Sequence, residues 1–111
     1  IYTVAQAEQG AKEYENACSS CHSANLRGNS NSPSLVGSSF LFLWENRPLE
    51  ELFTSIRTQM PTNAPNSLSA QAYISILAFI MDQNQFPPGD SELVPDPQTL
   101  ARIRITDRPG L

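Results

Sequence analysis

The chain has 111 residues, 40% of them apolar, and a formal net charge of −4. This length fits one domain over residues 1–111, and the arginines form no basic cluster, which excludes nucleic acid or an anionic membrane surface as the main partner. The longest apolar run, Phe40 to Trp44, is far too short to cross a bilayer, so we expect no membrane span in this chain.

The first segment, residues 6–22, has the polarity and spacing of an amphipathic helix. Ala7, Gly10 and Tyr14 fall on one of its faces. A glycine inside a helix costs up to about 1 kcal/mol relative to alanine, and a common reason to keep it is the close approach of another helix. Gly10 therefore predicts a helix crossing.

Two segments of different character follow. Residues 23–34 are rich in serine, asparagine, glycine and proline and are typical of a loop. Residues 35–46 form either a short helix after Ser39 or a buried strand, because periodicity does not separate the two in this apolar stretch. Residues 47–60 then predict a helix with Pro48 at its first position.

The strongest helix signal covers residues 68–84. Ser69 is expected as its N-cap, and Leu68 and Tyr73 are spaced as a hydrophobic staple. In the tail, residues 100–106 alternate apolar and polar side chains, which suggests an extended segment laid on the body of the domain. The elements together predict an all-α fold of three or four short helices, joined by long loops, with an extended C-terminal tail.

The stretch Cys18-Ser-Ser-Cys21-His22 contains both cysteines and the only histidine of the chain. A redox-active cysteine pair belongs after a strand in a βαβ unit, whereas this motif ends a helical segment. A zinc ion needs four ligands, or three and a water, and no further cysteine or histidine is available. Covalent haem attachment uses all three residues, so the motif predicts one haem c.

In such a site the sulfur atoms of Cys18 and Cys21 form thioethers with the macrocycle, and His22 is the proximal iron ligand. The second axial ligand is Met60 or Met81, since no other histidine exists. Met81 lies on the apolar stripe of the last helix, where core packing is the ordinary role. Met60 stands at a helix end and is followed by a proline, so we favour Met60.

Ligation by histidine and methionine fills both axial positions and raises the reduction potential, so the chemistry that remains is one-electron transfer. The alternative is a haem-based sensor or ligand-binding module with a labile axial Met60. A haem enzyme such as a peroxidase needs a vacant distal face with a general base, and no second histidine is present to serve. We therefore expect an electron carrier and no enzyme.

The chain resembles the class I c-type cytochromes over residues 5–86. The matching stretches are "GAKEY" before "CSSCH", then "SPSLVGSSF", "MP" and "ILAFI". In that family the first and last helices cross at near right angles through a glycine and aromatic residues. The resemblance implies that Gly10 and Tyr14 pack against Ile76 and Phe79, although the family usually has tyrosine where Phe79 stands.

The resemblance also implies further haem contacts. Pro33 matches the proline whose carbonyl accepts the other N–H of the proximal histidine, and Leu35 would then pack on the haem edge. Trp44 either donates to a haem propionate or packs in the core, and Arg57 either neutralises a propionate or is solvated.

Residues 1–86 are thus expected to form the haem-binding core, and residues 87–111 a proline-containing C-terminal extension. We expect the apolar haem pocket to be built from a subset of Leu35, Phe40, Leu52, Phe53, Ile56 and Leu77.

A closer resemblance lies in "LFTSIRTQMP" and "LSAQAYISILAFIMDQNQFPPGDSEL". These stretches are similar to the cytochrome domains or subunits associated with quinoprotein (PQQ-dependent) dehydrogenases. The resemblance implies a dehydrogenase as electron donor and an oxidase or other cytochrome as respiratory acceptor. The dehydrogenase itself needs an all-β propeller, which 111 residues do not supply.

Haem is attached covalently outside the bacterial cytoplasm, so we expect a periplasmic, exported chain. No signal-peptide pattern stands at Ile1, and we therefore expect the sequence to be a mature form or a domain of a larger protein.

Overall fold

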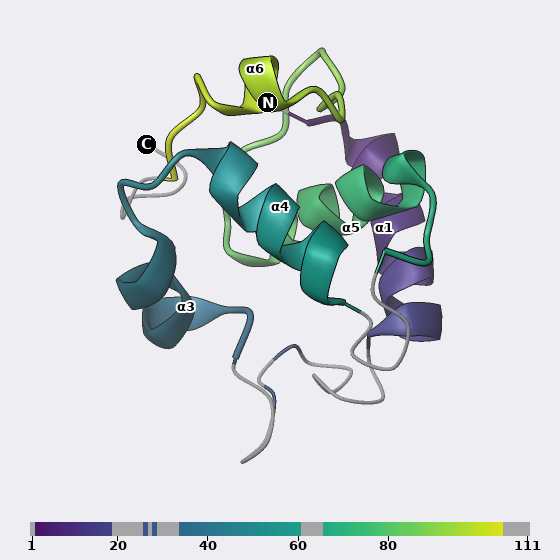
Figure 1. The fold of residues 1–111 in the computed structure, drawn as a ribbon, viewed down its shortest axis with the longest axis horizontal. Helices are drawn as coiled ribbons and strands as arrows, with labels where there is room; N and C mark the ends of the chain where they lie inside the picture. Colours follow the sequence, from purple (N-terminus) through teal and green to yellow (C-terminus); the bar gives the residue numbers. More distant parts are fainter. Residues whose placement is uncertain (1, 19–25, 27, 29–33, 61–65, 106–111) are drawn as a thin grey trace.

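The computed structural model describes residues 2–18, 26, 28, 34–60 and 66–105 (Figure 1). The helices in these ranges are α1 (Val4–Ala17), α3 (Gly37–Trp44), α4 (Leu49–Gln59), α5 (Ala70–Gln83) and the one-turn α6 (Pro97–Leu100). Within the described residues, the β-type pairing is limited to one isolated bridge between Pro48 and Arg104. The predicted all-α class is confirmed. None of the described helices has the length and apolar character that crossing a membrane requires.

The most extensive helix contact in the described chain is the crossing of α1 and α5, and it depends on Gly10. A Cβ atom on Gly10 would lie 1.8 Å from the carbonyl oxygen of Ser75 and 2.9 Å from the Cβ of Phe79. One turn further along α1, the rings of Tyr14 and Phe79 meet with their centroids 5.4 Å apart. The predicted crossing is confirmed, with the main chain of Ser75 as the closest contact of Gly10.

Side-chain capping explains where α1 and α5 begin. The Ser69 hydroxyl accepts a hydrogen bond from the Ala72 N–H at 3.1 Å, as predicted for α5. α1 begins at Val4, two residues earlier than expected, because the Thr3 hydroxyl accepts from the Gln6 N–H at 3.1 Å. Pro48 is the N-cap of α4 and not its first helical residue, since its ψ of 143° is extended.

The apolar segment that was ambiguous between helix and strand forms the helix α3. It starts at Gly37, whose φ of +79° suits glycine. The Gly37 N–H donates to Oδ1 of Asn84 at 3.0 Å, and Nδ2 of Asn84 donates to the Leu35 carbonyl at 2.9 Å. The buried Asn84 amide thus ties the beginning of α3 to the end of α5.

The described part of the C-terminal extension is packed into the core. The Gln6 side chain forms two hydrogen bonds with Leu93: it accepts from the amide at 2.9 Å and donates to the carbonyl at 2.8 Å. At the other end, the Leu49 N–H donates to the Ile103 carbonyl at 2.7 Å. The extension therefore holds both the start of α1 and the start of α4.

One turn of this extension was not predicted. α6 is capped by Asp96, whose carboxylate accepts from the Gln98 N–H at 3.3 Å, and Pro97 occupies the first helical position. The extended interpretation of residues 100–106 is wrong at Leu100, the last residue of α6. It holds at Arg104, where the chain pairs with Pro48.

Candidate functional site

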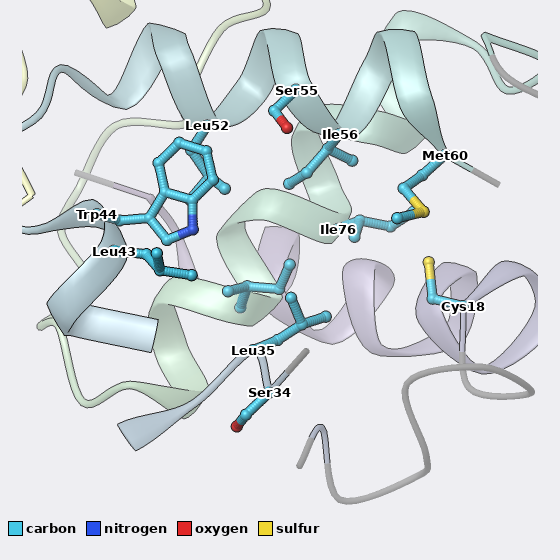
Figure 2. Close-up of a pocket in the computed structure, with 11 residues that line it drawn as sticks. Cys18, Ser34, Leu35, Leu43, Trp44, Leu52, Ser55, Ile56, Met60 and Ile76 are labelled. Carbon is cyan, nitrogen blue, oxygen red and sulfur yellow. The ribbon is translucent and has the colours of Figure 1, made fainter. Parts of the chain in front are cut away.

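A mainly apolar pocket lies among α3, α4, α5 and the end of α1 (Figure 2). It contains about 730 Å³ of space, including the part of its mouth that is open to solvent. The described residues that line it are Cys18, Ser34, Leu35, Leu43, Trp44, Leu52, Ser55, Ile56, Met60, Ile76 and Ile80.

Helical spacing explains why α4 and α5 form two of the walls. Leu52, Ser55 and Ile56 lie at positions i, i+3 and i+4 of α4, and Ile76 and Ile80 lie four residues apart on α5. Side chains at these spacings share one face of a helix, so each helix presents a continuous surface to the pocket.

Two sulfur-containing side chains lie at the same end of the pocket. Cys18 is the C-cap of α1, where its N–H donates to the Tyr14 carbonyl at 2.8 Å, and Met60 is the C-cap of α4. Figure 2 shows their sulfur atoms pointing toward one another, with Ile76 between their helices. The two chain segments that carry these sulfur atoms therefore leave their helices at the same end of the pocket.

Trp44 forms the wall at the opposite end (Figure 2). The guanidinium carbon of Arg47 lies 4.3 Å from the indole ring centroid, on the exposed side of α3. Within the described parts of the chain, no group accepts a hydrogen bond from the indole N–H. The indole is thus held by stacking, and its N–H remains available for a group bound in the pocket.

Tyr14 stands beside the cysteine end of the pocket and is neutral at physiological pH. Burial is the main cause that raises the pKa of Tyr14 to about 12, and the nearby Cys18 side chain adds to it. The phenol therefore contributes packing against Phe79 and no charge near the sulfur atoms.

The structure brings together four of the predicted haem contacts: Cys18, Leu35, Trp44 and Met60 all line the pocket. Arg57 is not among the lining residues. Its Cζ lies 5.7 Å from the Phe53 ring centroid, and its Nε is buried without a hydrogen-bond acceptor among the described residues.

Three predicted site residues, Cys21, His22 and Pro33, lie outside the described residues. Met81 is 1% exposed in the core and does not line the pocket, which agrees with the core role assigned to it.

Of the apolar pocket residues that the sequence suggested, Leu35, Leu52 and Ile56 line the pocket, whereas Phe40, Phe53 and Leu77 are buried in the core. The pocket is also lined by residues that were not expected there: Ser34, Leu43, Ser55, Ile76 and Ile80. The spacing of Ile76 and Ile80 on one helix face was a usable signal. Leu43 carried none, because its neighbours in α3 are also apolar.

The residues present fit a haem of the c type. Aliphatic side chains form most of the lining, the Cys18 thiol and the Met60 thioether lie at one end, and an indole N–H lies at the other. Cys18 is half-buried, so its sulfur is accessible from within the pocket. A soft sulfur ligand in an apolar cavity is the environment that His/Met haem iron requires.

Comparison with known proteins gives one family. The family described as cytochrome c oxidase, cbb3-type, subunit III matches residues 5–80, well over half of the chain. The match begins in α1, includes the CxxCH motif, Met60 and the pocket, and ends in α5. Searches of curated proteins and of solved structures gave no match. The chain belongs to the family of cbb3-type cytochrome c oxidase subunit III, and is a class I c-type cytochrome domain that carries haem c and transfers electrons.

Proposed function

We propose that this chain is a one-electron carrier with a single haem c, attached by thioethers at Cys18 and Cys21 and ligated by His22 and Met60. The observation that carries the proposal is the meeting of Cys18 and Met60 at one end of an apolar pocket, with Cys18 the first residue of the only CxxCH motif. Bound haem would supply an iron that gains and loses one electron.

The chain's own residues have distinct parts in this proposal. The Met60 thioether is a soft ligand that favours the ferrous state, and the Pro33 carbonyl would orient the His22 imidazole. The aliphatic walls contributed by Leu35, Leu52 and Ile76 exclude water from the pocket.

Two residues are proposed as partners of the haem propionates. Trp44 is the first, because its indole N–H has no acceptor within the described residues and lies on the pocket wall. Arg57 is the second: it does not line the described pocket, but its buried Nε also lacks an acceptor among those residues. A propionate would satisfy either donor.

The denatured protein is expected to exceed its polypeptide mass by one haem and to contain no thiol that an alkylating reagent modifies. In the folded, reduced protein, carbon monoxide should bind slowly and incompletely at neutral pH, because Met60 already occupies the second axial position. Intact mass and the reduced absorption spectrum measure both properties. A bare polypeptide mass with two reactive thiols would refute covalent attachment, and fast, complete carbon monoxide binding would favour the sensor with a labile Met60.

The proposed donor is a quinoprotein dehydrogenase in the periplasm, and the proposed acceptor is an oxidase or another cytochrome. The resemblance of the stretch around Met60 and of the stretch that contains α5 supports the donor. The net charge is −4 and Lys12 is the only lysine, so the chain has no lysine cluster to steer a partner.

Reduction of the oxidised protein by a substrate-reduced quinoprotein dehydrogenase is therefore expected to depend little on salt. Stopped-flow rates at 10 mM and 300 mM ionic strength should agree within about twofold, because screening acts mainly on long-range charge steering. Mitochondrial cytochrome c, with its ring of lysines, is the control for a salt-sensitive donor reaction. A rate that falls steeply with salt would show that charge steering contributes to docking, and would contradict this expectation. If the dehydrogenase does not reduce the protein at all, quinoprotein dehydrogenases are excluded as the donor.

A further inference from the structure

Tyr73 joins the main chain on both sides of the segment that follows Met60. Its side chain is 1% exposed. The hydroxyl donates to the Met60 carbonyl at 2.7 Å and accepts from the Leu68 N–H at 3.3 Å. One buried phenol thus uses its donor and its acceptor capacity to connect residue 60 to residue 68.

Two hydrogen bonds from two different helices hold the backbone of Met60. Its N–H donates to the Ile56 carbonyl within α4 at 2.9 Å, and its carbonyl accepts from Tyr73 on α5. The backbone between these two groups is extended, with φ of −125° and ψ of 150°. Because both bonds act on main-chain atoms of Met60, they restrict the direction of its Cα–Cβ bond, and with it the direction from which the thioether enters the pocket.

The same face of α5 carries this contact and forms a wall of the pocket. Tyr73, Ile76 and Ile80 lie at positions i, i+3 and i+7, and the two isoleucines line the pocket. Figure 2 shows Ile76 next to Met60. α5 is itself held by its crossing with α1 at Gly10, so the phenol projects from a fixed support.

We propose that Tyr73 is a positioning residue for the Met60 ligand, through a hydroxyl that holds the Met60 carbonyl and the Leu68 amide. The inference rests on the proposed function, in which Met60 ligates the haem iron. Tyr73 does not touch the iron in this proposal. It reduces the freedom of the chain that carries the ligand, and so lowers the fraction of molecules in which the thioether has dissociated.

Tyr73→Phe removes the hydroxyl and keeps the ring. In the reduced, haem-loaded protein, carbon monoxide should then bind about five to ten times faster than in the parent, because dissociation of Met60 limits binding. This factor corresponds to about 1 to 1.4 kcal/mol, the net contribution of an ordinary hydrogen bond. Stopped-flow absorption after mixing with carbon monoxide measures the rate.

Tyr2→Phe is the matched control. Tyr2 is fully buried, and its hydroxyl also donates to a backbone carbonyl, that of Phe86, but it does not line the pocket. The Tyr2→Phe substitution should lower stability as Tyr73→Phe does, and should leave the rate of carbon monoxide binding unchanged. An equal acceleration in both variants would mean general loosening, and would overturn the positioning role.

A second measurement tests the same coupling in a variant that retains Tyr73, so it does not depend on whether Tyr73→Phe folds. If the hydroxyl and the ligand support one another, loss of the ligand must weaken the hydroxyl contact by the same factor. Hydrogen exchange at the Leu68 amide should therefore be five to ten times faster in Met60→Ala, which retains the residue 60 carbonyl. The Leu93 amide, held by the Gln6 side chain, is the control and should not change.

The outcomes separate the two proposals. If Met60→Ala leaves the spectrum and the carbon monoxide rate unchanged, Met60 is not the ligand, and both proposals fail. If Met60→Ala changes them but Tyr73→Phe binds carbon monoxide at the parent rate, the electron carrier stands and the role of Tyr73 is wrong. Unchanged exchange at Leu68 leads to the same second conclusion.

Discussion

Replacing Gly10 with alanine is expected to lower the free energy of unfolding by about 3 kcal/mol or more, at the upper end of overpacking substitutions. The new Cβ would lie 1.8 Å from the carbonyl oxygen and 2.5 Å from the carbonyl carbon of Ser75. Both are backbone atoms within α5, so no side-chain rotation relieves the overlap. The helices must move apart, and α5 carries Ile76 and Ile80 on the pocket wall. Urea unfolding of the haem-loaded protein measures the loss.

Ala5→Gly is the control for this experiment. Ala5 is an exposed position in the first turn of the same helix, where helix propensity alone predicts a loss of at most about 1 kcal/mol. Propensity alone would make Gly10→Ala stabilising by a similar amount, so the two explanations predict opposite signs. A neutral or more stable Gly10→Ala variant would show that α1 and α5 do not approach at this residue.

The features that the sequence predicted well are those encoded by neighbouring residues. Ser69 precedes a clear apolar period, and its hydroxyl caps α5 as expected. Gly10 in an otherwise good helix signalled the crossing. Cys18 and Met60 were predicted to share one site, and both line the pocket at the same end, a placement that no local pattern specifies.

Other features depend on partners distant in the chain. α3 could not be distinguished from a strand, because Phe40 to Trp44 are all apolar and the helix start is fixed by Asn84. The two hydrogen bonds between Gln6 and Leu93 join residues 87 positions apart. No local pattern identifies such a pair, so the alternation in residues 100–106 predicted a tail laid on the body of the domain but not the contact of Leu93 with Gln6.

Tyr73 illustrates how a local pattern can miss a second role. The spacing predicts that its ring packs against Leu68 as a staple at the start of α5, and the structure shows a hydrogen bond in which its hydroxyl accepts from the Leu68 N–H. The bond to the Met60 carbonyl depends on how α4 and α5 are placed relative to each other, which helical periodicity does not specify. The Tyr73 hydroxyl therefore connects the segment that caps α5 to the end of α4 that carries Met60.

Met60→Ala is expected to convert the iron from low spin to high spin and to lower the reduction potential by roughly 100 mV or more, within the ~0.8 V over which axial ligands set haem potentials. Alanine offers no donor atom, so the soft ligand that favours the ferrous state is lost. Met60 is the C-cap of α4 and only partly buried, so the fold should tolerate the change. Absorption spectra and potentiometric titration measure the two effects.

Met81→Ala is the control that distinguishes loss of an iron ligand from loss of core packing. Met81 is 1% exposed in α5 and does not line the pocket, so its truncation should cost about 2–5 kcal/mol of stability. The spectrum and the potential should remain those of the parent, because the Met60 thioether is untouched. The reverse pattern, with the spectral change in Met81→Ala and a parent-like spectrum in Met60→Ala, would assign the second axial position to Met81. The α5 face that carries Tyr73 and Ile76 would then not be the support of the ligand.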